Sequence, residues 1–178
     1  MDLPRALAEL SALHADVDRA ALGVAAQHLE RLQCRRGCAQ CCVDGITVFP
    51  VEAARIQGEH GELLDRGAPG PEGACAFLDA AGGCRIYGAR PYVCRTQGLP
   101  LRWIEVDEAG RGVELRDVCP LNDPPDAPPL EGLDPEACWT IGPFEERLAA
   151  LQIALDGRPD LQRVALRDLF GSPRPPGG

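Results

Sequence analysis

The sequence predicts an α+β fold: a small, helix-rich, irregular domain with short strands and hairpins, one long N-terminal helix and two C-terminal helices. Three observations lead to this prediction. Apolar residues recur at helical spacing at both ends of the chain. Between those ends, short strand-forming runs alternate with turns rich in Gly and Pro. No stretch shows the regular succession of strands and helices that builds a parallel sheet.

The N-terminal part of the chain predicts one long helix. Its apolar stripe recurs every seven residues, at Leu3, Leu10, Val17 and Val24. We expect this helix to run from Leu3 to about Leu32, with Gly37 as its stop. His14 and His28 are expected to be partly exposed residues beside the stripe.

The next part predicts short elements. A β-like run is expected at residues 46–49, and Pro50 can open a second helix that reaches about Gly58. Residues 61–73 are rich in Gly and Pro, so we expect a loop. Residues 75–78 and 84–87 are expected to be two short strands around a Gly-rich turn.

The second half of the chain continues this pattern. One helical turn is expected at 89–94, and a hairpin from strands Leu101–Val106 and Val113–Arg116. Residues 120–135 carry six prolines and predict an extended connector.

Two amphipathic patterns close the chain. They predict helices over Pro143–Leu155 and Pro159–Phe170. With a length of 178 residues, the chain is expected to form a single domain over residues 1–170, followed by a disordered tail over 171–178.

The composition excludes several reaction classes. All 18 basic residues are Arg, so the chain has no lysine for a Walker-type loop or a Schiff base. Its two serines, Ser11 and Ser172, lie in a helical run and in the tail, which does not suit a serine hydrolase. A net charge of −9 argues against nucleic acid as a partner.

The N-terminus lacks the basic start of a signal peptide, and no apolar run is long enough to cross a membrane. We therefore expect a cytoplasmic protein without a membrane partner, in which thiols stay reduced. A secreted disulfide protein is the least favoured alternative, because an odd number of cysteines would leave one unpaired.

Nine cysteines are the main candidates for chemistry. Four fall within nine residues as C-x3-C-x2-C-C, three follow at wider spacing, and two flank the Pro-rich connector. Short spacings allow two sulfurs to meet one metal ion. We expect all nine to be metal ligands: Cys34, Cys38, Cys41, Cys42, Cys75, Cys84, Cys94, Cys119 and Cys138.

The charges near these cysteines are one-sided. Three Arg and no acid lie between Glu30 and Asp44, and four Arg and no acid lie between Asp79 and Glu105. Cations of this kind favour thiolate over thiol. The fold is therefore expected to be centred on a metal.

The spacing does not identify the metal. Zinc and an iron or iron–sulfur centre both accept thiolates alone. Neighbouring side chains diverge, so Cys41 and Cys42 indicate either two sites or a bridging ligand. Nine thiolates would serve two four-cysteine sites with one to spare, or one multinuclear centre.

Three blocks of the sequence resemble the YkgJ-like cysteine-cluster family, described as a zinc- or iron-chelating domain. They are Cys34-Arg-Arg-Gly-Cys38-Ala-Gln-Cys41-Cys42, Cys75-Ala-Phe-Leu-Asp with Gly83-Cys84-Arg-Ile-Tyr, and Arg90-Pro-Tyr-Val-Cys94-Arg95. The resemblance spans about residues 30–140. It implies that the seven cysteines in these blocks are ligands, with Cys138 matching a later family cysteine less closely.

Three functions are compatible with this pattern. The first is a cytoplasmic metal-binding protein. The second is an iron–sulfur redox or S-adenosylmethionine-dependent enzyme or accessory, because Cys34, Cys38 and Cys41 have the spacing of radical enzymes of that kind and related domains occur in flagellin lysine methylases. This chain lacks the barrel of the radical enzymes and the length expected of a flagellin lysine methylase. The third is a zinc-stabilised module that binds a protein partner.

Overall fold

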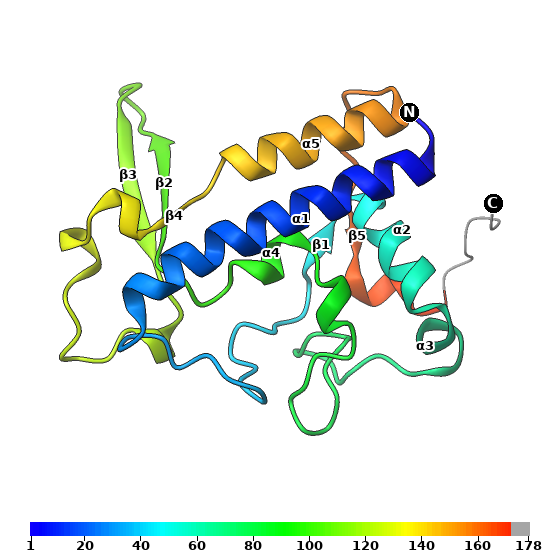
Figure 1. Cartoon of the computed structure of the whole chain (residues 1–178), viewed down its shortest axis with the longest axis horizontal. Coiled ribbons are helices and arrows are strands. Elements are labelled where there is room, and N and C mark those ends of the chain that lie inside the picture. Colours follow the sequence, from blue (N-terminus) through cyan, green and yellow to red (C-terminus); the bar gives the residue numbers. More distant parts are fainter. Residues whose placement is uncertain (172–178) are drawn as a thin grey trace.

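The computed structural model describes residues 1–171, so the expected tail lies outside the described residues except for Gly171. Two long helices lie side by side and antiparallel along one edge of the molecule (Figure 1). Helix α1 (Leu3–Ala25) is capped by Asp2, whose carboxylate accepts the N–H of Arg5 at 3.0 Å. Helix α5 is Pro143–Asp156.

The first hydrophobic core lies between these two helices. Leu10 and Val17 of α1 are fully buried, and Leu148 of α5 is nearly so. Trp139 closes one end of this core, with its ring 5.1 Å from that of Phe144. Residues spaced by helical turns therefore bury one face of each helix, as the apolar pattern predicts.

A second core includes buried residues of α2 (Pro50–Glu59) and α3 (Gly61–Arg66). Strand β1 (Thr47–Val48) pairs antiparallel with β5 (Val164–Ala165), which brings the end of the chain back to this core. The centre of the core is Phe77, which is fully buried.

A three-stranded sheet forms the other end of the molecule (Figure 1). Strands β2 (Leu101–Val106) and β3 (Gly112–Asp117) form the expected hairpin. Strand β4 (Trp139–Thr140) pairs parallel with the start of β2. The Asp107 carboxylate accepts the N–H groups of Ala109 and Arg111, which fixes the hairpin turn.

Short helices fill the connections. Helix α4 has four residues, Tyr92–Arg95. The 3-10 helices are Ala26–His28, Tyr87–Ala89, Pro120–Asn122, Leu130–Gly132, Pro135–Ala137 and Leu166–Leu169. Within residues 1–171, no helix has the length and apolar character that crossing a membrane requires.

The α+β class is confirmed, but the second C-terminal helix is not. Residues 159–170 contain β5 and a 3-10 helix instead of one α-helix. The β-branched Val164 pairs with β1, and the Arg163 side chain donates to the hydroxyl and carbonyl oxygens of Thr47. Leu166 and Leu169 are still buried, so tertiary pairing satisfies the same apolar residues without a helix.

Other expectations are also wrong in detail. Helix α1 ends at Ala25, seven residues early, and α3 lies in the expected loop over 61–73. His14 and His28 are buried, with exposed fractions of 2% and 7%. The two expected strands around residues 79–83 reduce to one bridge, because the Asp79 carboxylate holds a tight turn by accepting two backbone N–H groups.

Candidate metal centre

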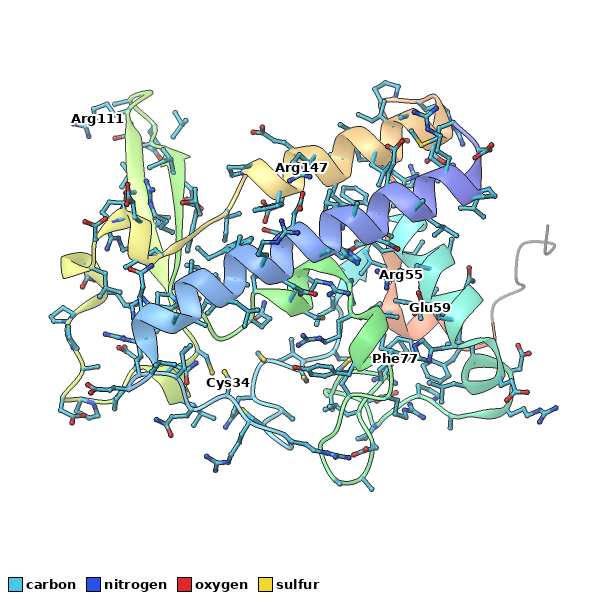
Figure 2. The ribbon with its side chains drawn as sticks, viewed as in Figure 1. Cys34, Arg55, Glu59, Phe77, Arg111 and Arg147 are labelled. Atoms are coloured by element: carbon cyan, nitrogen blue, oxygen red, sulfur yellow. The ribbon has the colours of Figure 1, made fainter. Side chains whose placement is uncertain are left out.

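The cysteine-bearing segments meet on one side of the molecule, next to α4. In Figure 2 the yellow sulfur atoms gather near the labelled Cys34, below the ribbon of α1. Backbone contacts join the segments: the Cys75 N–H donates to the Cys42 carbonyl at 2.9 Å. Beside it, Val43 and Ala74 form a β-bridge. The first and second cysteine blocks are therefore held together by the main chain.

Tight turns fold the first block back on itself. The Cys38 N–H donates to the carbonyl of Arg35 at 2.9 Å, and the Cys42 N–H donates to that of Ala39 at 3.0 Å. Gly37 has a φ of 85°, which a residue with a side chain rarely adopts. The four cysteines of this block therefore lie in a segment that folds back on itself through two turns.

Phe77 anchors the second block. Its ring lies 5.1 Å from that of Phe170, deep in the second core, and Figure 2 labels it there. Cys75 is buried two residues earlier, and Cys84 follows across the bridge to Leu78. Burial of this aromatic ring thus anchors the segment between the two cysteines, whose turn is held by Asp79.

Five cysteines influence one another strongly enough to be treated as one set, which we call the five-thiol group: Cys41, Cys42, Cys75, Cys84 and Cys94. Cys75 acts on three other members of the group. Its negative charge would raise the pKa values of Cys42, Cys84 and Cys94.

The vicinal pair is polarised. The hydrogen bond from the Cys42 thiol lowers the pKa of Cys41 to about 6. The same bond, followed by burial, raises the pKa of Cys42 well above its ordinary value. The hydrogen bond within the pair therefore favours loss of the proton from Cys41 over loss of the proton from Cys42.

Burial acts on the other members. It raises the pKa of Cys94 to about 12, with smaller increases from Cys75 and Cys84. Burial also raises the pKa of Cys84. The positive charge of Arg90 lowers the pKa values of Cys41, Cys84 and Cys94. Arg90 therefore lies near three of the five thiols.

Arg90 is fixed in this position. Its guanidinium lies 3.8 Å from the centre of the Tyr87 ring and donates to the carbonyl of Cys94 at 3.3 Å. The sequence predicts Arg residues near the cysteines, and Arg90 is one that the structure places there. A fixed cation offsets negative charge on a thiolate centre.

Cys34 and Cys119 lie beside this group and share a neighbour. The side chain of Asn122 donates to the sulfur of Cys34 at 3.4 Å, and its backbone N–H donates to the carbonyl of Cys119 at 2.7 Å. Cys119 and Cys41 also line one pocket of about 270 Å³. Cys38, which lies between Cys34 and Cys41 in the sequence, is half-buried.

Cys138 has a different environment. It is buried next to Trp139 at the start of β4. Burial raises its pKa, and the largest charge effects on it come from Arg116 and Arg102.

Among residues 1–171, no three His, Cys, Asp or Glu side chains are arranged so that they could hold a metal ion. The structure brings cysteine segments together without aiming the sulfur atoms at a common point. The donor chemistry does suit zinc or iron, because the five-thiol group offers sulfur alone. No sequence pattern points to Asn122 as a neighbour of Cys34, although it is the only asparagine in the chain.

Comparison with known proteins gives one finding. Residues 33–120 match the family model CxxCxxCC, whose description is "Putative zinc- or iron-chelating domain". No curated protein and no solved structure matches the chain. The matched segment contains every cysteine except Cys138. The expected resemblance to a cysteine-cluster family of zinc- or iron-chelating domains is thus confirmed for residues 33–120.

Proposed function

We propose that the chain is a cytoplasmic metal-binding protein that holds zinc or an iron or iron–sulfur centre through cysteine thiolates. The observation that carries this proposal is the five-thiol group around Cys75. Burial, and for Cys42 the hydrogen bond to Cys41, raises most of their pKa values, and repulsion between neighbouring thiolates adds a smaller increase. A bound cation would replace the protons and remove that repulsion.

The ligand set follows from position. We assign the five-thiol group as its core, with Cys34, Cys38 and Cys119 completing it from the adjoining segments. Cys138 is the proposed cysteine outside the centre, because the charged groups that act most strongly on it are Arg and Glu rather than other thiols. Eight ligands leave open two four-cysteine sites or one multinuclear centre.

The cytoplasmic location is proposed from the thiols. All nine cysteines are free. A reducing compartment keeps cysteines free. A metal centre made of thiolates requires free cysteines, because a disulfide leaves no thiolate to bind the metal.

Matched cysteine variants test the proposal. We expect protein purified without oxygen to contain zinc or iron. The metal content of Cys75→Ser should be at least tenfold lower, because Cys75 acts on three other members of the group. Cys138→Ser is the control and should keep the wild-type content. Elemental analysis and absorption spectroscopy measure both.

A wild-type protein that is folded, colourless and free of metal would overturn the proposal. Equal losses from Cys75→Ser and Cys138→Ser would place Cys138 inside the centre instead.

A second candidate is an iron–sulfur enzyme with an open coordination position. The pocket lined by Cys41 and Cys119 favours it, because a small molecule there would reach the edge of the centre. This candidate predicts a reducible paramagnetic cluster whose spectrum changes when S-adenosylmethionine is added. Protein that contains only zinc would exclude it.

A further inference from the structure

A buried side-chain amide, that of Asn122, links the Pro-rich connector to the segment that follows α1. The side chain of Asn122 is completely buried. Its Oδ1 accepts the backbone N–H of Gln33 at 2.7 Å. Its Nδ2 donates to the carbonyl of Gly98 at 2.7 Å and to Sγ of Cys34 at 3.4 Å. Each hydrogen of the amide thus has its own acceptor.

The backbone of Asn122 is held as well. Its carbonyl accepts a hydrogen bond from Arg31 at 3.3 Å, and Arg31 is itself 5% exposed. The same guanidinium binds the Asp123 carboxylate at 3.1 Å and the carbonyl of Pro128. Asn122 therefore cannot turn away from Cys34 without breaking several buried contacts.

Gly98 completes the enclosure of the Cys34 sulfur. Its φ is +93°, and a Cβ at this position would lie 2.5 Å from Sγ of Cys34 and 3.3 Å from Nδ2 of Asn122. Only glycine leaves room for the sulfur between this backbone and the amide. The sulfur is thus confined although Cys34 as a residue is exposed.

We propose that Asn122 is a positioning residue of the metal centre, which aims the Cys34 thiolate through an N–H···S hydrogen bond. This inference rests on the proposed function, because it requires Cys34 to be a ligand. A neutral donor draws charge from the sulfur without adding a charge of its own, and it fixes the direction of the remaining lone pairs.

The single asparagine gives a direct test. Protein labelled with isotopic nitrogen at asparagine has one side-chain amide signal, and an NMR-active cadmium ion can replace the natural metal. We expect one of the two amide protons to show scalar coupling to cadmium across N–H···S, while the proton bonded to Gly98 shows none. Absence of coupling in cadmium-loaded protein would overturn the inference.

Variants provide a second readout in the full chain. Asn122→Asp keeps the acceptor for Gln33 but places a carboxylate oxygen where Nδ2 meets the sulfur. We expect it to bind cobalt(II) about 10 to 100 times more weakly and to shift the sulfur-to-cobalt absorption band. Asp123→Asn alters the neighbouring contact to Arg31 without touching Cys34, and should change neither quantity.

A double-mutant cycle separates positioning from general stability. In a Cys34→Ser background, Asn122→Asp should cause no further loss of cobalt affinity. A further loss of the same size would show that Asn122 acts on the fold rather than on Cys34. If wild type binds no metal, the proposed function fails; if wild type binds metal and Cys34→Ser binds it equally well, only this inference fails.

Discussion

At the scale of single residues, buried His14 has a defined protonation state. Its Nδ1 lies 2.8 Å from the guanidinium of Arg55, which can only donate, so Nδ1 is the acceptor. The proton of the neutral ring is then on Nε2, 3.4 Å from the Glu52 carboxylate. Burial lowers the pKa of His14 below 6.5, and the interaction with Glu52 only partly opposes this.

This protonation state predicts a pH effect. The unfolded chain binds the His14 proton near pH 6.5, whereas the folded chain binds it only at lower pH. Stability is therefore lost as the pH falls below 6.5. We expect an NMR titration of the His14 ring to give a midpoint below 6.5, and His14→Gln to flatten the acid side of the stability curve. A midpoint above 6.5 would contradict the assignment.

At the scale of elements, Glu52 links two helices across the interior. Its carboxylate, 3% exposed, accepts the N–H of Tyr92 at the start of α4 at 2.7 Å. The other oxygen accepts the N–H of Phe49 at the start of α2 at 3.3 Å. Because α4 carries Cys94, this side chain also sets where that thiol lies.

Replacing Glu52 tests this link. Glu52→Ala leaves two buried N–H groups without an acceptor, and we expect a loss of about 2–4 kcal/mol in the free energy of unfolding. Glu59→Ala, on the exposed side of the same helix, removes only the surface pair with Arg55 and should cost less than about 1 kcal/mol. Urea unfolding measures both. Equal losses would mean that Glu52 is not a structural link.

The elements also show what sequence can predict. Helices α1, α2 and α5 and the β2–β3 hairpin were predictable because each carries its own apolar period, proline start or turn. The strand β5 was not, since its conformation depends on β1, more than a hundred residues away. Among the site residues, short spacing predicted the first cysteine block. Asn122 meets Cys34 across 88 residues, and no local pattern indicates such a contact.

At the scale of the whole molecule, helices and strands are unevenly distributed along the chain. The structure has no helix or strand between residues 29 and 46 or between 67 and 86, apart from isolated bridges. These segments carry most of the cysteines, while α1 and α5 pack through a continuous apolar core. On this account, the metal contributes the cross-links that secondary structure does not.

Metal removal should therefore act locally first. After anaerobic chelation, we expect amide hydrogen exchange to rise at least tenfold in residues 33–47 and 74–98, because little regular secondary structure protects their amides. Exchange in the middle of α1 and α5 should change little. Mass spectrometry of peptides reads both regions in one sample. Equal protection with and without chelator would show that the metal does not hold these segments.

The central claim is that cysteine sulfur holds the metal, and X-ray absorption at the metal edge of anaerobically purified protein tests it most directly. We expect a zinc or iron edge and a nearest shell of sulfur at about 2.3 Å. That signal should be largely lost from Cys75→Ser. A nearest shell of nitrogen and oxygen alone, or folded protein with no zinc or iron edge, would contradict the account.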